Sequence, residues 1–135
     1  MNSIKNLITH NIKWLMLIPG IVTCSMIYNT IDPQAGLMQT FGAGMEHPLA
    51  EVVVRSWGFL IALVGALMMY GAYQPQSRNL ILVIAVVSKL AFILLNLIYG
   101  QAYIGTSIVA IAFDSVLIVL YSTYLLQNRH LDKTA

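Results

Sequence analysis

Two charged residues that could carry proton or ion chemistry stand alone in long apolar stretches. Lys89 and Asp114 are the only charged residues between Arg78 and Arg129. An ammonium and a carboxylate placed together can relay a proton, line an ion pathway or bind a polar ligand, but they can also neutralise each other as a buried pair. The sequence leaves both interpretations open, and either one requires the two side chains to point away from lipid.

Polar residues recur at seven-residue spacing around this pair. Asn96 follows Lys89 by seven residues, and Ser107 and Tyr121 lie seven residues before and after Asp114. Because seven residues are close to two helical turns, each set would share one helix face. The spacing therefore predicts two polar stripes that face the interior of a helix bundle and support the charged pair.

A second candidate site contains His47, Glu51 and Arg55 at spacing i, i+4, i+8. Glu51 near a helix start suits the helix dipole, and Glu51 with Arg55 is a favourable i,i+4 pair. This outer cluster is either an ion-paired helix start or the rim of a polar pocket. His47 and Glu51 supply only two metal ligands, so no metal site is expected.

No sequence motif of a known catalytic site is present: there is no HExxH, GxSxG, CxxC or phosphate loop. No cofactor is predicted, and we expect a protein that is not an enzyme. The single cysteine, Cys24, rules out an intrachain disulfide within this sequence.

The composition indicates which solvent surrounds these residues. Of the 135 residues, 59% are hydrophobic and 9% are charged, far from the roughly 45–50% and 25% typical of soluble domains. A water-soluble chain of this length could not bury so much apolar surface, so the lipid bilayer is the expected partner. The net charge of +2 and the lack of a basic stripe give no indication of nucleic-acid binding.

Four stretches are long enough to cross a bilayer as helices, which takes about 20 mostly apolar residues. We predict spans at about residues 12–28, 48–73, 79–98 and 103–126, in one transmembrane domain over residues 1–135. A short interfacial helix at residues 37–41 fits the loop after the first span. We expect the first span to be retained rather than cleaved, because Thr23 before Cys24 is a poor lipoprotein cleavage residue.

The C-terminal half can also be read as a single span over residues 90–113, with Lys89 and Asp114 at its ends. That arrangement leaves the apolar runs at residues 80–87 and 116–126 without a role, so two spans joined by a turn at residues 99–101 are preferred. At 1.5 Å per residue the two charges then lie about 16 Å and about 20 Å from the same membrane face.

The basic residues predict the orientation. On one side of a four-span arrangement lie Lys5, Lys13, Arg78, Arg129 and Lys133. Only Arg55 lies toward the other side. Because short cytoplasmic loops carry the excess of lysine and arginine, the N- and C-termini are predicted to be cytoplasmic. The predicted fold is an all-α, integral membrane four-helix bundle, multi-pass in the cell inner membrane.

Small residues recur at four-residue spacing in the predicted second span, at Gly58, Ala62 and Ala66. This spacing lets helices approach closely, either within the bundle or in a homodimer, and the sequence leaves both open. Because four spans enclose little interior, we expect a homo-oligomer or a larger membrane complex.

The order of elements is similar to that of a known protein family. A short first span is followed by a loop with Pro33 and Gly36, and then by Arg55-Ser56-Trp57-Gly58 near the start of a helix rich in small residues. This layout resembles the DoxX-like group of small bacterial four-helix membrane proteins. The resemblance implies the four-helix bundle and a structural or binding role for Arg55.

These observations predict a non-enzymatic accessory or small-ligand-binding subunit of the inner membrane that contains a buried Lys89–Asp114 pair. Two alternatives remain open. One is a small transporter or channel that couples protons or ions through this pair. The other is a membrane enzyme that acts on a lipid or quinone-like substrate at the outer cluster.

Overall fold

The computed structural model describes residues 2–132, and every regular element within them is a helix. Four segments are long and apolar enough to cross a membrane: Asn6–Ile31, Pro48–Tyr73, Pro75–Tyr99 and Gln101–Asn128. The prediction of an all-α chain with four long apolar helices is therefore confirmed.

The long helices are α1 (Asn2–Cys24), α4 (Pro48–Tyr73), α5 (Pro75–Tyr99) and α6 (Ile104–Asp132). The short elements are η1 (Ser25–Ile27), α2 (Tyr28–Ile31), α3 (Pro33–Phe41) and η2 (Gln101–Tyr103). From α1 the chain runs through η1, α2, α3 and a loop at residues 42–47 into α4. Gln74 alone separates α4 from α5, and η2 makes the turn into α6.

Several helices extend beyond the predicted bounds, and proline explains two of the differences. Pro33 and Pro75 each occupy the first turn of a helix, where the missing N–H has no intrahelical partner to lose. Consequently α5 begins at residue 75 rather than 79. The predicted helix at residues 37–41 begins at Pro33, because the Asp32 carboxylate accepts a hydrogen bond from the Ala35 N–H at 3.1 Å. Gly42, with φ of 70°, ends it in the left-handed region.

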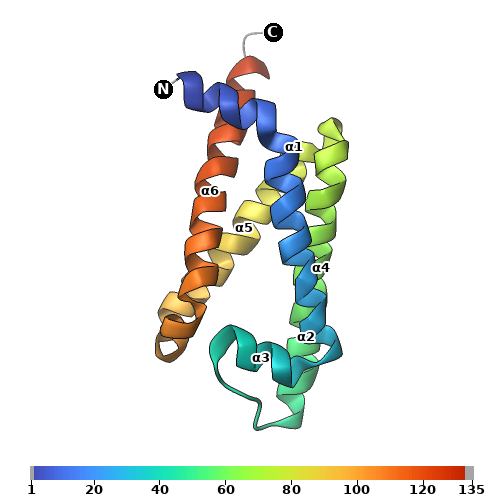
Figure 1. Cartoon of the computed structure of the whole chain (residues 1–135), viewed down its shortest axis with the longest axis vertical. Helices are drawn as coiled ribbons and strands as arrows, with labels where there is room; N and C mark the ends of the chain where they lie inside the picture. Colours follow the sequence, from blue (N-terminus) through green and yellow to red (C-terminus); the bar gives the residue numbers. More distant parts are fainter. Residues whose placement is uncertain (1, 133–135) are drawn as a thin grey trace.

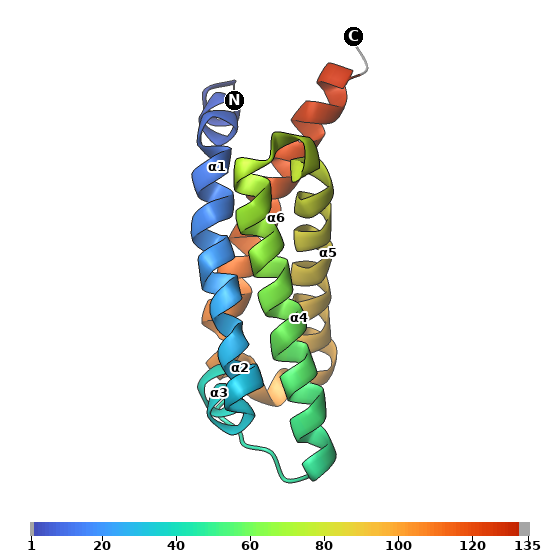
Figure 2. The same cartoon turned by 90° about the vertical axis from the view of Figure 1, so that its right-hand side faces the viewer.

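The long helices form two pairs (Figure 1). α1 packs along α4, and α6 packs along α5. The start of α1 and the end of α6 lie at the same end of the bundle, which we call the terminal end. α3 lies across the opposite end, which we call the distal end. α4 and α5 meet near the terminal end, and α5 leans away from α4 toward the distal end (Figures 1 and 2). α3 contacts both α4 and α6.

The hydrophobic core lies in the terminal half of the bundle, where all four long helices meet. Its buried members are Ile8, Ile12, Met16, Met68, Ala72, Ile81, Leu82, Ala85, Leu117, Tyr121 and Tyr124. A Cβ on Gly71 would lie 2.7 Å from the Met16 Cε atom of α1 and 3.0 Å from the Ile81 Cδ1 atom of α5, both ends of flexible side chains. In the distal half, α4 and α5 contribute no buried member to this core.

Two glycines of α4 pack within the chain, at positions 58 and 65, whereas Ala66 of the predicted small-residue pattern is exposed. A Cβ on Gly58 would lie 2.7 Å from the Asn29 Cβ, and a Cβ on Gly65 would lie 2.7 Å from the Gly20 carbonyl oxygen. A Cβ on Gly65 would also collide with the Cys24 backbone nitrogen. This face of α4 is thus occupied by the first span, so a homo-oligomer would have to use another surface.

Tyr121 donates a hydrogen bond to a carbonyl of α1 that has no donor within its own helix. Pro19 lies inside this helix and has no N–H to donate to the carbonyl of Leu15, four residues earlier. The hydroxyl of Tyr121, which is fully buried, donates a hydrogen bond to that carbonyl at 2.7 Å. A neighbouring helix therefore supplies the partner that the proline removed, as is common where water is absent.

We expect Tyr121→Phe to lower the free energy of unfolding by about 1 kcal/mol, because it strands the Leu15 carbonyl. In a Pro19→Ala background the same change should cost much less, since an alanine at that position would restore an N–H to the carbonyl. Unfolding of the four proteins in mixed micelles with increasing dodecyl sulfate measures this double-mutant cycle. Additive effects of the two substitutions would contradict the assignment.

Candidate functional site

Lys89 and Asp114 form an ion pair between α5 and α6. The lysine Nζ donates a hydrogen bond to the aspartate Oδ1, and the two side chains are only 7% and 15% exposed. The ring centroid of Phe113 lies 5.9 Å from Nζ, which adds a weak cation–π contact. The inward orientation and the pairing expected from the sequence are both present, near the middle of each helix.

The pair has few polar neighbours. Among the described residues, Lys89 Nζ has no hydrogen-bond partner other than Asp114. Neither residue lines the two hollows described below. The pair thus links α5 to α6 while largely buried, and removing one partner would leave a buried charge without compensation.

The predicted polar stripes face the interior but do not connect to the pair. Asn96 and Ser107 are buried, and each bonds to a carbonyl of its own helix or the turn before it: Asn96 Nδ2 to Phe92 at 2.9 Å and Ser107 Oγ to Tyr103 at 3.0 Å. Tyr121 bonds to α1, as described above. Within residues 2–132 none of the three is hydrogen-bonded to Lys89 or Asp114, so these side chains do not form a continuous relay.

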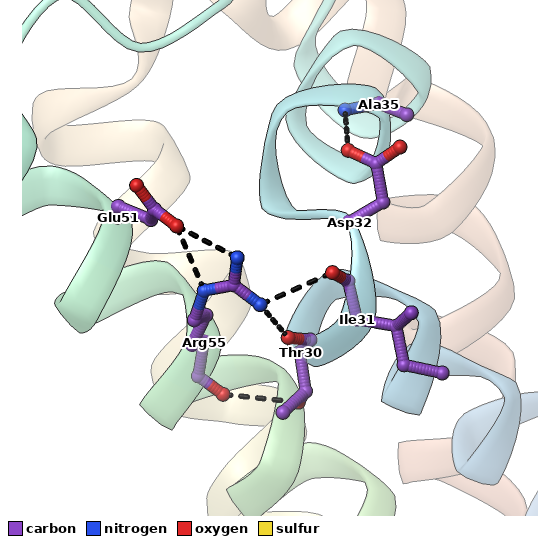
Figure 3. A network of polar contacts seen from close by, with 6 residues as sticks. All are labelled: Thr30, Ile31, Asp32, Ala35, Glu51 and Arg55. Atoms are coloured by element: carbon purple, nitrogen blue, oxygen red, sulfur yellow. Dashed lines mark hydrogen bonds and ion pairs between the residues drawn. The ribbon is translucent and has the colours of Figure 1, made fainter.

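In the outer cluster, Arg55 ties the start of α4 to the end of the first span (Figure 3). Its Nε and Nη2 atoms donate to Glu51 Oε1 at 3.0 and 2.7 Å. Its Nη1 atom donates to the carbonyls of Thr30 and Ile31, and the Thr30 hydroxyl donates back to the Arg55 carbonyl at 3.0 Å. These contacts satisfy carbonyls at the end of α2, which have no intrahelical donor.

His47 does not join this network. It occupies the N-cap position of α4, is exposed, and makes no side-chain hydrogen bond within the described residues. A hollow of about 420 Å³ lies beside Arg55, Glu51 and His47 at the distal end. Within residues 2–132 no three His, Cys, Asp or Glu side chains gather as metal ligands would. The contacts of Arg55 and Glu51 match those of an ion-paired helix start.

A larger cavity, which the sequence reasoning missed, lies between α4 and α5 in the distal half. It has a volume of about 510 Å³, and Leu37 and Phe41 of α3 contribute to its lining. Phe41 packs against Trp57 of α4 with ring centroids 6.0 Å apart and against Tyr103 with centroids 6.3 Å apart. The cavity is lined by residues of α3, α4 and α5. In Figure 1 the ribbons of α4 and α5 diverge toward this end of the bundle.

The cavity opens sideways between the two helices. Val53 and Leu60 on α4 and Leu95 on α5 line it, and each is more than half exposed. The remaining lining is apolar apart from Trp57, Ser88 and Asn96. A sequence signal exists in retrospect: Ser88 and Asn96 share the side of α5 that also carries Phe92. Whether this side of α5 faces Trp57 and the aliphatic residues of α4 depends on helix tilt, which periodicity does not encode.

Comparison with protein-family models, with curated proteins and with solved structures finds no significant match to this chain. The resemblance to the DoxX-like group therefore stays a prediction from the layout of the sequence. The functional argument rests on the geometry of the cavity, the ion pair and the Arg55 network.

Proposed function

We propose that this chain is a multi-pass protein of the cell inner membrane, with both termini cytoplasmic, that binds a small lipid-soluble molecule between α4 and α5. The proposed orientation is supported by the excess of basic residues toward the terminal end. The four long apolar helices and their many exposed large hydrophobic side chains support insertion into lipid.

The observation that carries this proposal is the cavity of about 510 Å³. Its volume falls in the range of about 300–1,000 Å³ typical of small-molecule sites, which are mostly apolar with a few polar groups. In a bilayer, its side opening between Val53, Leu60 and Leu95 would face hydrocarbon directly. A ligand would therefore enter from the lipid rather than from water.

The Lys89–Asp114 pair has a supporting role in this proposal. By linking α5 to α6, it favours the tilt that separates α5 from α4 at the distal end. A transporter or channel that worked through the pair would need it to face a water-filled path, and the pair lines neither hollow. For this reason ligand binding is preferred to ion coupling, and the outer cluster is assigned to holding α2 against α4.

The proposal is tested by filling the cavity. Ala91 lies on its wall, so the ring of Ala91→Phe should take up space that a ligand needs and reduce the occupancy of bound lipid by about tenfold, which corresponds to about 1.4 kcal/mol. Native mass spectrometry of the protein extracted in mild detergent would count lipid adducts that survive removal of the micelle. Ala112→Phe, an exposed position on α6 away from the cavity, is the matched control. Equal adduct counts in all three proteins would exclude a site between α4 and α5.

A further inference from the structure

Three polar groups in the otherwise apolar cavity wall have no hydrogen-bond partner within residues 2–132. They are the indole N–H of Trp57, the hydroxyl of Ser88 and the Oδ1 atom of Asn96. Asn96 is only 7% exposed, and its Nδ2 atom is the one that bonds to Phe92. No fully buried side-chain nitrogen or oxygen of the described residues lacks a partner, so these three groups retain some exposed surface, and their residues line the cavity.

Unpaired polar groups are costly in this setting. A donor or acceptor at a water-exposed surface bonds to water, but in hydrocarbon it has no alternative partner. Serine in a helix commonly bonds to the carbonyl four residues earlier, and Ser88 does not do so. A ligand that supplies the missing partners would therefore be favoured over a plain hydrocarbon chain.

Trp57 and Asn96 offer complementary chemistry from facing walls. Trp57 lies nine residues from the distal start of α4, about 14 Å deep, and Asn96 lies three residues from the distal end of α5, about 5 Å deep. Both residues line the same cavity, so the two polar groups face one space from neighbouring helices. One is a donor and the other an acceptor.

The cavity favours a neutral head group. No charged side chain among the described residues lines it. The nearest cations along the walls are Arg55 and Lys89, and each is already held by a carboxylate. Within this apolar lining, a phosphate or carboxylate would be desolvated without a counter-ion.

Building on the proposed function, we infer that the ligand is a neutral lipid with a free hydroxyl group, such as a long-chain alcohol or a diacylglycerol, whose hydroxyl accepts from Trp57 and donates to Asn96. A hydroxyl group is the smallest neutral group that can do both. The apolar chain of the ligand fills the rest of the cavity, toward Ser88 and the crossing of α4 and α5.

Trp57 provides a direct test, because the chain has only two tryptophans and the other, Trp14, is 57% exposed on α1. The tryptophan fluorescence of the Trp14→Phe variant comes from Trp57 in the cavity. The fluorescence of the Trp57→Phe variant comes from Trp14 on the lipid-facing surface. Each is reconstituted in phosphatidylcholine vesicles that contain increasing mole fractions of a long-chain alcohol brominated in mid-chain. The methyl ether of that alcohol, and a phosphatidylcholine with the same brominated chains, are the comparison quenchers.

The alcohol should quench Trp57 at about tenfold lower mole fraction than its methyl ether, which can accept but not donate a hydrogen bond. Asn96→Leu should abolish that difference and leave the folded protein intact, because the Asn96 side chain bonds only within its own helix. The surface reporter Trp14 should respond equally to all three quenchers.

The possible results separate the two proposals. If the ether or the phosphatidylcholine quenches Trp57 as well as the alcohol does, while all act at lower mole fraction than on Trp14, the cavity binds lipid but the hydroxyl inference is wrong. If Trp57 and Trp14 respond alike to every quencher, there is no selective site, and the proposed function falls as well. The comparison of the three quenchers uses a protein whose cavity residues are unchanged. It therefore tests the hydroxyl inference even if the Asn96→Leu variant fails to fold.

Discussion

Replacing Lys89 alone by leucine is expected to lower the free energy of unfolding by about 3–5 kcal/mol, because it strands the Asp114 carboxylate between α5 and α6. The combined change Lys89→Leu and Asp114→Leu should recover most of this loss, since two leucines pack where two charges were compensated. Unfolding in mixed micelles and the yield of monodisperse protein measure both effects. If the double variant is as unstable as the single one, the two charges act separately and the pairing is of no energetic consequence.

The other ion pair among the described residues provides the matched control. Glu51 and Arg55 form an i,i+4 pair whose side chains are 48% and 41% exposed. Glu51→Gln removes its charge near the water interface, where such a pair contributes about 0–1 kcal/mol. The contrast between the two positions therefore tests whether burial, rather than the presence of an ion pair, determines the cost.

Gly65→Ala is expected to lower the free energy of unfolding by about 2–3 kcal/mol, the upper part of the range for overpacking. The new methyl group would meet backbone atoms of the first span, including the Gly20 carbonyl oxygen at 2.7 Å, and backbone cannot rotate away as a side chain can. α1 and α4 would have to separate along their shared length. The same micelle unfolding experiment measures the loss.

Gly105→Ala is the corresponding control in α6. A Cβ at this position meets no atom within 4 Å, so the substitution should raise the free energy of unfolding by about 0.5–1 kcal/mol through helix propensity alone. If Gly65→Ala were as mild as Gly105→Ala, the close approach of α1 and α4 would not be a determinant of stability. A change of oligomeric state in Gly65→Ala would instead assign this face to contacts between chains.

These two features together explain why the bundle has a cavity. Glycines let α1 approach α4, and the buried ion pair holds α6 to α5, so the strongest contacts lie within each pair. The pairs are joined by the core near the terminal end, where Gly71 lies beside Met16 of α1 and Ile81 of α5. Toward the distal end no comparable contact of the described residues draws α4 and α5 together, and α3 covers the opening that results.

Much of the fold could be predicted from the sequence because it depends on local rules. Apolar length indicated four helices, and the turn residues at positions 99–101 separated the last two, since α5 ends and η2 leads into α6 there. Once those helices were antiparallel, rise per residue alone placed Lys89 and Asp114 at similar depth. The inward orientation of Asn96, Ser107 and Tyr121 followed from helical periodicity in the same way.

The sequence by itself thus determined the helices, their order and the faces that carry polar groups. Only the tertiary structure decided what those groups contact: Tyr121 the carbonyl freed by Pro19, Arg55 the end of α2, and Trp57 with Asn96 an apolar cavity. The physical reason is that periodicity specifies the direction of a side chain around its own helix axis. The crossing angle and spacing of two helices come from the sum of their contacts along the whole interface, and a cavity exists only where that sum leaves a gap.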